Sequence, residues 1–326
     1  VVLALLATAG LVWDGHRQLR APLAIGEHRN FELPPGRRLR DAVLRLRDEG
    51  PFTHFRQALY LEAWGRISGD AARIKAGEYS LDPGLSSLDM LALWVGGKTL
   101  LHELRIIEGM RFDQALALVL GHPELRQTLT DTRPQAIMAT LGHPDRHPEG
   151  RFFPDTYRFP KGTTDLELLR QAMHAMDRLV EQTWAGRDPA LPYARADDML
   201  TMASIVEKET GLASERERIA GVFVRRLRQG MRLQTDPTVI YGLGERFDGN
   251  LRRRDLLADG PYNTYLRSGL PPTPICLPGR AALEAAVNPA PGTELYFVSR
   301  GDGSHHFSAT LAEHNAAVRR YQLGGG

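Results

Sequence analysis

The chain has 326 residues, of which 42% are hydrophobic and 25% are charged, and this length exceeds what a single hydrophobic core usually supports. The formal net charge is only +2, and no basic run with interleaved aromatic residues accompanies it, so we do not expect nucleic acid as a partner. The one cysteine, Cys276, excludes an internal disulfide framework and any site built from several cysteines. We therefore expect at least two folded parts, with Cys276 as a small packing residue.

Residues 1–13 are apolar throughout and end on Trp13, directly before Asp14. Such a segment is typical of the outer part of a membrane span, although a complete spanning helix needs roughly 20 apolar residues. The hydrophobic region of a signal peptide and a buried helix are the alternatives. We expect a truncated transmembrane anchor that is followed by a polar linker, the two together covering residues 1–29.

Residues 30–109 alternate short strand patterns with helical patterns. Strands are expected at Phe31 to Leu33, at residues 73–79 and at residues 102–107. Apolar residues recur at helical spacing over residues 39–46, and a helix over residues 87–95 is followed by two glycines. The pattern predicts a small α+β domain.

Residues 110–196 are expected to form a mainly helical connector, with a first helix from Phe112. The segment from Glu149 to Tyr157 interrupts it with aromatic and turn-forming residues. A packed loop is one interpretation of this segment. We expect it to border a cleft instead, because Asp155 and Tyr157 offer polar groups beside aromatic surface.

Residues 197–326 begin with a helix near Asp197 that carries Glu207 directly after an apolar stretch. At 100° per residue, Glu207 shares a face with Ala203 and Ser204, whereas Glu209 points roughly opposite. Apolar surroundings disfavour the charged form of a carboxyl group, so the pKa of Glu207 is expected to rise from about 4.3 toward roughly 6 to 7, where a glutamate can serve as a general acid. The alternative is a solvated surface helix.

Five short motifs rich in turn-forming and aromatic residues follow in the C-terminal half. They are Gln234 to Thr238, Tyr262 to Tyr265, Gly269 to Pro272, Asn288-Pro289 and Gly303 to Ser308. Together with residues 203–210, their order and spacing resemble the YceG-like endolytic murein transglycosylases. The resemblance extends from about Asn30 to the C-terminus.

The resemblance implies an α+β fold with an N-terminal membrane anchor, a LysM-like domain over residues 30–109 and a catalytic α+β domain over residues 197–326. It implies cleavage of the β-1,4 bond between N-acetylmuramic acid and N-acetylglucosamine within peptidoglycan strands. Glu207 would be acid and then base, and the C6 hydroxyl of the muramic sugar would be the nucleophile, leaving 1,6-anhydro ends. No cofactor is implied. The protein would act as a strand terminase beside peptidoglycan synthases, held by a single span in the inner membrane with its catalytic part in the periplasm.

The same motifs supply the candidates for substrate binding. In the implied site, polar groups orient sugar hydroxyl and acetamido groups, aromatic rings stack on sugar rings, and a histidine holds the cleft wall. A buried core position is the alternative for each tyrosine, and a helix start is the alternative for the aspartate. These candidates are Gln234, Asp236, Tyr262, Asn263, Tyr265, His305 and Phe307.

The chain departs from the family pattern at Thr273 and Ser304, where glycine is usual, so the local loop geometry is in question. We expect no metal site, because His305 and His306 are adjacent and point to opposite faces of a strand.

A lysozyme-like hydrolase stays open as an alternative and would need Asp236 or Glu217 as a second carboxylate. A non-catalytic adaptor that binds the cell wall also stays open. The spacings Ser214-x-x-Glu217 and Thr310-x-x-Glu313 each predict a capping box at a helix start.

Overall fold

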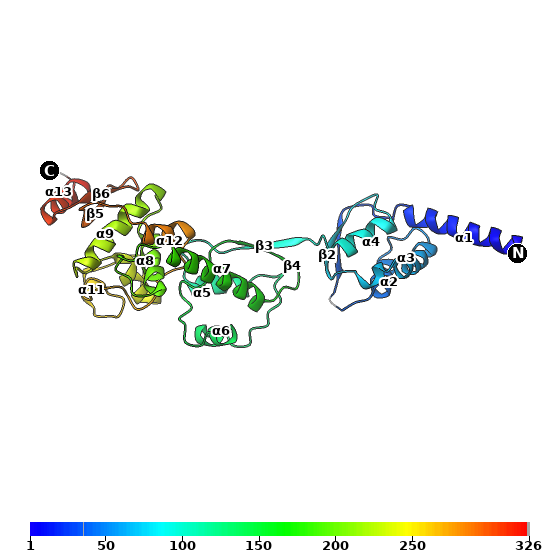
Figure 1. The fold of residues 1–326 in the computed structure, drawn as a ribbon, viewed down its shortest axis with the longest axis horizontal. Helices are drawn as coiled ribbons and strands as arrows, with labels where there is room; N and C mark the ends of the chain where they lie inside the picture. The colour runs from blue at the N-terminus through cyan, green and yellow to red at the C-terminus, as the bar shows by residue number, and fades with distance from the viewer. Residues whose placement is uncertain (35, 325–326) are drawn as a thin grey trace. The chain divides into compact units, whose positions relative to one another are not determined.

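The computed structural model describes residues 1–34 and 36–324, which fold into two compact units. The first unit comprises residues 1–103 and 158–163, and the second comprises residues 104–157 and 164–326. The described residues hold thirteen α-helices and three two-stranded sheets (Figure 1). The expected α+β class is thereby confirmed. The chain leaves the first unit within β3 (Leu101–Arg105) and returns to it briefly in β4 (Thr156–Pro160), which pairs with β3.

The first unit packs three helices around an antiparallel pair of strands. The strands β1 (Arg29–Leu33) and β2 (Gly77–Leu81) place Phe31 opposite Tyr79, and both rings are buried. Around them lie α2 (Leu39–Asp48), α3 (Phe55–Ile67) and α4 (Ser87–Gly96). The expected strand over residues 73–79 begins later, at Gly77, and α3 was not predicted from the sequence. The small α+β pattern is confirmed, and its likeness to a LysM domain stays a prediction.

The N-terminal segment forms α1 (Val2–Arg20), whose first thirteen residues are mostly exposed. Among the described helices, none combines the length and the apolar character that crossing a membrane requires. The expected polar linker from residue 14 is helical as far as Arg20, which corrects that prediction. The helix continues past residue 14 because it packs on α3. Asp14 accepts hydrogen bonds from Tyr60 Oη and Arg56 Nη1, each at 2.8 Å, and these bonds join α1 to α3.

The second unit is organised around α8 (Ala196–Glu209), in which residues 199–206 are all buried. A helix that is buried on every side must be covered by other elements, and α7, α9, α10 and α12 pack against it. The helical connector therefore folds together with the last part of the chain. The remaining helices and strands of this unit are α5 (Phe112–Leu120), α6 (Pro134–Thr140), α7 (Asp165–Ala185), α9 (Arg216–Arg228), α10 (Asp236–Leu243), α11 (Arg253–Leu257), α12 (Arg280–Val287), β5 (Tyr296–Ser299), β6 (His305–Ser308) and α13 (Leu311–Tyr321).

Local hydrogen bonds fix the elements around α8. Ser204 Oγ accepts from the Ile275 amide at 3.0 Å, and the fully buried Cys276 thiol contacts the Ser204 carbonyl, which confirms Cys276 as a packing residue. At the start of α7, the buried Asp165 carboxylate accepts hydrogen bonds from the amides of Thr128 and Leu129 at 2.9 to 3.0 Å. These bonds tie the segment before α6 to α7.

The C-terminal elements form a small layer of their own. The strands β5 and β6 pair antiparallel, and α13 packs on both of them (Figure 1). The capping box at Thr310 and Glu313 is confirmed. The one predicted at Ser214 is wrong, because α9 begins at Arg216 after a short 3₁₀ turn, without a side-chain cap.

The loop expected to border the cleft is pinned inside the second unit. Gly150 has φ +79°, and a Cβ atom there would lie 2.7 Å from two atoms of the Pro274 ring. Tyr157 is buried and its hydroxyl donates to the Phe153 carbonyl at 2.5 Å, so it offers no polar group to a cleft. The prediction for Tyr157 is wrong because the loop turns its ring into the core.

Candidate active site

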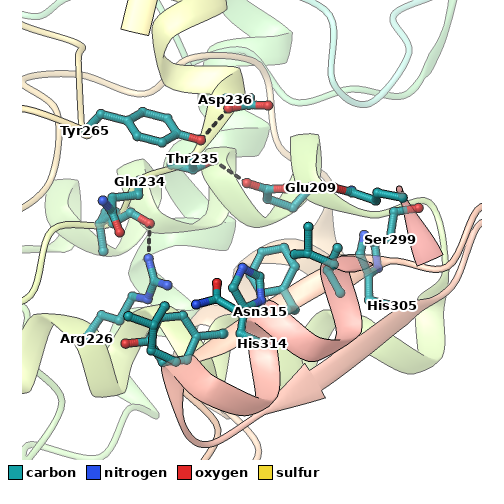
Figure 2. Close-up of a pocket in the computed structure, with 17 residues that line it drawn as sticks. Glu209, Arg226, Gln234, Thr235, Asp236, Tyr265, Ser299, His305, His314 and Asn315 are labelled. Carbon is teal, nitrogen blue, oxygen red and sulfur yellow. Dashed lines mark hydrogen bonds between the residues drawn. The ribbon is translucent and has the colours of Figure 1, made fainter. Parts of the chain in front are cut away.

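A pocket of about 520 Å³ opens beside the C-terminal end of α8, between the loop that precedes α10 and the β5–β6 layer with α13 (Figure 2). Elements far apart in the sequence contribute to its wall. The pocket brings together four of the candidates for substrate binding, and two of its other wall residues are important for its chemistry although sequence reasoning had not selected them. These six are Gln234, Asp236, Tyr265 and His305, with Glu209 and Thr235.

Glu209 is the last residue of α8, and its side chain lines this pocket. The Thr235 hydroxyl donates a hydrogen bond to its carboxyl group (Figure 2). Burial raises the pKa of Glu209 to about 7, and the neighbouring Asp236 carboxylate adds to the rise, whereas Thr235, His305 and Arg226 oppose it. A carboxyl group that keeps its proton near neutral pH is suited to general acid catalysis.

Gln234 has φ 51°, and no other non-glycine residue in the described ranges has a positive φ. Its amide donates to the Thr264 carbonyl at 3.1 Å, and the Thr235 amide donates to Thr264 Oγ1 at the same distance. The Tyr262–Tyr265 motif therefore holds the Gln234 segment in a strained shape against the pocket. Such backbone strain is often found at functional sites.

Asp236 is the first residue of α10, with Thr235 as the N-cap, so the helix starts one residue earlier than it would if Asp236 were the N-cap. Tyr265 Oη donates to Asp236 Oδ1 at 2.5 Å (Figure 2). This bond orients the Asp236 carboxylate toward the pocket that Glu209 lines. Two carboxyl groups thus share one pocket, and their mutual repulsion favours protonation of Glu209.

His305 lies on β6 and is held by Glu215, a buried residue from the turn before α9. The His305 amide donates to Glu215 Oε1 at 3.0 Å, and the ring Nδ1 lies 2.7 Å from Glu215 Oε2. This double contact fixes the imidazole in the pocket wall. Sequence reasoning missed Glu215, because 90 residues separate it from His305 and no local pattern marks the pair.

Three candidates lie outside this pocket. The Asn263 side chain makes its hydrogen bonds with nearby backbone: Nδ2 donates to the carbonyls of Leu256 in α11 and of Ala258, and Oδ1 accepts from the Tyr265 amide. Tyr262 donates to or accepts from Thr273 Oγ1 at 2.7 Å. The structure therefore places neither Asn263 nor Tyr262 on the wall of this pocket, although Tyr262 lines a smaller hollow nearby.

Phe307 is the third of these candidates. Its ring lies 4.0 Å below the guanidinium of Arg218 and packs against Phe297, which itself lines the pocket. Phe307 thus stands one layer behind the wall. A sugar ring stacked on its face would have to displace Arg218.

Glu207 also lies outside the pocket, although it is close to Glu209 in sequence. Its side chain is 7% exposed, Oε2 accepts from the Gly279 amide at 2.9 Å, and Arg216 lies 3.8 Å from Oε1. Burial raises its pKa, as expected, and Glu108 adds to the rise. Because Gly279 is the N-cap of α12, the Glu207 carboxylate caps that helix and joins it to α8.

The two departures from the family pattern have defined places. Thr273 bonds to Tyr262 and also donates to the Pro274 carbonyl at 2.9 Å, and its φ is not positive, so no glycine is required there. Ser304 Oγ and its amide both donate to Asp302 Oδ1, which shapes the turn between β5 and β6. In the described residues, no group of three or more histidine, cysteine, aspartate or glutamate side chains is arranged to hold a metal ion.

Comparison with known proteins yields a consistent set of relatives. A family model described as the YceG-like family matches residues 31–320. An endolytic murein transglycosylase of Bacillus subtilis (strain 168) is 32% identical over 268 residues, covering 77% of this chain and 74% of that protein. One of Streptococcus pneumoniae serotype 2 (strain D39 / NCTC 7466) is 28% identical over 282 residues, covering 76% of this chain and 51% of its own length.

Similarity to a solved structure agrees with this. The crystal structure of a yceG-like protein from Listeria monocytogenes aligns with a TM-score of 0.57 and 32% identity, over 90% of this chain and 99% of that one. The resemblance inferred from the motifs is confirmed, including its start near Asn30.

Proposed function

The chain belongs to the YceG-like family, and from this premise we propose that Glu209 is the catalytic carboxyl group of an endolytic murein transglycosylase. The enzyme would be a lyase that cuts the β-1,4 bond between N-acetylmuramic acid and N-acetylglucosamine inside glycan strands. One observation carries the proposal: a carboxyl group with a pKa of about 7 lines the same pocket as Gln234, Asp236 and His305.

This proposal replaces Glu207 by Glu209 as the acid. Both carboxyl groups have a raised pKa, so protonation does not distinguish them. Their positions differ in access to substrate, because Glu209 lines the pocket, whereas Glu207 points away from it and caps α12 at Gly279. A general acid must reach the oxygen that it protonates, and geometry therefore outweighs the pKa.

In the proposed reaction, Glu209 donates its proton to the glycosidic oxygen as the bond from that oxygen to C1 of the muramic sugar breaks. The C6 hydroxyl of the same sugar attacks C1, and the Glu209 carboxylate takes up the C6 proton. The products are a new 4-hydroxyl end and a 1,6-anhydro end, and no water is consumed. An intramolecular nucleophile benefits from a high effective concentration, so one carboxyl group suffices for both proton transfers.

The other pocket residues receive roles from their positions. Asp236, oriented by Tyr265, would stabilise positive charge that develops at C1. Gln234 would hydrogen-bond to sugar hydroxyl or acetamido groups, and His305 would hold the pocket wall. Asn263 and Tyr262 would support the loop that carries Tyr265.

Hydrolysis of the lysozyme type is a second candidate, and the presence of Asp236 in the same pocket as Glu209 favours it. Cleavage in oxygen-18 water separates the two reactions. Transglycosylation leaves anhydro ends without heavy oxygen, whereas hydrolysis places heavy oxygen at the new reducing ends.

The residue assignment is tested on isolated sacculi with purified variants. Glu209→Gln should abolish release of anhydro ends, and the matched change Glu207→Gln should leave most of the cleavage in place. If Glu207→Gln alone abolished cleavage, the acid would be Glu207 and the assignment to Glu209 would be wrong. If the wild-type protein bound sacculi without cutting them, the adaptor alternative would hold.

Action on peptidoglycan implies a place outside the cytoplasm, and we extend this to the chain as part of the proposal. A single span in the inner membrane, glycan binding by the first unit and partnership with peptidoglycan synthases stay predictions. Deleting residues 1–29 and measuring cleavage of isolated sacculi tests whether the N-terminal segment contributes to the chemistry.

A further inference from the structure

Two more hollows lie in the second unit, apart from the pocket around Glu209. One, of about 550 Å³, is lined by Tyr241, Phe247 and Lys208 among others. The other, of about 350 Å³, is lined by Glu149 and by the same Tyr241. Because Tyr241 and Arg111 line both, the two hollows adjoin each other.

The larger hollow and the candidate active site are lined by residues that are adjacent in sequence at two places. Lys208 lines it and Glu209 lines the active-site pocket, and these residues are neighbours in the last turn of α8. Pro237 lines it and Asp236 lines the active-site pocket, and these residues are neighbours in the first turn of α10. The three hollows therefore follow one another around α10.

The smaller hollow contains a buried carboxyl group that the proposed reaction does not use. Glu149 is 4% exposed, Oε1 accepts from the Phe112 amide at 2.9 Å, and the carboxyl group is also hydrogen-bonded to Tyr241. Burial raises the pKa of Glu149 to about 7. Such a carboxyl group can accept hydrogen bonds from sugar hydroxyl groups, and in its protonated form it can also donate one.

Cations in these hollows already have partners. Arg111 Nη2 lies 2.7 Å from an oxygen of Asp113, and Lys208 Nζ donates to the Gly109 carbonyl at 3.2 Å. With these hydrogen bonds made and aromatic faces at Tyr241 and Phe247, the lining suits a polar ligand with apolar ring faces.

A polymer cut at an internal bond needs contacts on both sides of that bond. The pocket around Glu209, at about 520 Å³, falls in the range of about 300 to 1,000 Å³ that holds one drug-sized molecule. It can therefore take only a short piece of a glycan strand. The rest of the strand must lie on neighbouring surface.

We propose that the two hollows on the far side of α10 bind further N-acetylated sugars of the strand whose bond Glu209 cleaves. This inference rests on the proposed function and deepens it, because it gives the enzyme a binding region for the strand beyond the cut. Tyr241 and Phe247 stack on sugar rings, and Glu149 hydrogen-bonds to sugar hydroxyl groups in the smaller hollow.

The test measures cleavage of long and short glycan strands by a variant that alters the larger hollow and by a control variant. Phe247→Ala removes a half-buried ring there, and Leu257→Ala removes an exposed apolar side chain on α11 that lines none of the three hollows. Peptide-free glycan strands and the shortest oligosaccharide that the enzyme cuts serve as substrates. Phe247→Ala should lower kcat/KM on long strands by about tenfold and change kcat/KM on the short one by less than about twofold, whereas Leu257→Ala should change neither.

Tyr241→Leu provides a second variant, which removes the aromatic ring but keeps an apolar side chain, and it should show the same dependence on length if Phe247→Ala fails to fold. Equal losses on long and short substrates would overturn the inference. If wild-type protein released no anhydro ends from any substrate, the proposed function itself would fail. If the wild-type protein cut both lengths and the variants matched it, only this inference would fail.

Discussion

Replacing Glu209 by glutamine should remove a pH dependence of stability that the wild-type protein carries. Folding raises the pKa of this carboxyl group from 4.5 to about 7, chiefly through burial. The folded state therefore keeps a proton that the unfolded chain loses, and stability falls as the pH rises from about 4.5 to about 7. At about 1.4 kcal/mol for each pH unit, the loss amounts to about 3 kcal/mol.

Glutamine cannot ionise but can still accept the hydrogen bond from the Thr235 hydroxyl. Urea unfolding of both proteins at about pH 4 and about pH 8.5 measures the effect, because other titrating groups cancel in the difference between them. Relative to wild type, Glu209→Gln should gain about 3 kcal/mol on going from the lower to the higher pH. It should also be inactive, so a gain in stability would accompany a loss of function.

A matched change at an exposed glutamate, Glu217→Gln on α9, serves as the control and should give no such gain. An identical pH dependence for wild type and Glu209→Gln would refute the reasoning, because it would mean that folding does not perturb this carboxyl group. The pH profile of cleavage gives an independent check. Activity should decline as the pH rises through about 7, where Glu209 loses the proton that it must donate.

Three further predictions concern residues outside the pocket. Glu207→Ala should lower the free energy of unfolding by about 1 to 2 kcal/mol, because it leaves the Gly279 amide without its acceptor, while cleavage of sacculi persists. Gly150→Ala should cost at least about 2 kcal/mol in urea unfolding, since φ is +79° and the new methyl group would overlap Pro274. Burial opposes ionisation of Asp165, but hydrogen bonds outweigh it and lower its pKa, so its stabilising contribution is present above pH 3.8 and lost as the pH falls through the folded value. Asp165→Asn should cost about 1.5 to 3 kcal/mol at neutral pH and abolish that acid-side loss, as thermal unfolding at several pH values can show.

Much of the fold could be predicted from local sequence. The helix from Ser87 and the last helix after Thr310 both carry capping boxes and apolar periodicity, and both are found where expected. These signals are local because a helix satisfies its backbone within itself. The strand expected at Phe31 to Leu33 lies within β1, but β2 begins at Gly77 and not at residue 73, and α3 was missed, because the limits of these two elements depend on packing in the first unit.

The candidate site could be predicted only in part. The motifs identified the family, and four of the residues chosen from them, Gln234, Asp236, Tyr265 and His305, line one pocket. Asn263 belongs to the same motif as Tyr265, yet its side-chain amide group hydrogen-bonds to nearby backbone groups and does not line the pocket. A motif specifies residue types, whereas hydrogen-bond partners in the folded chain decide which side chains stay available to a ligand.

The different surroundings of Glu207 and Glu209 on one helix were decided by tertiary structure alone. The sequence by itself determined that a carboxyl group follows the apolar part of α8, and periodicity places Glu207 and Glu209 on different faces. It did not determine which face meets solvent, because α8 is covered on all sides by helices from distant parts of the chain. Glu207 meets the Gly279 amide at the start of α12, and Glu209 meets Thr235 and the pocket. The identity of a buried acid's neighbours, and hence its access to substrate, arises only when separate segments pack together.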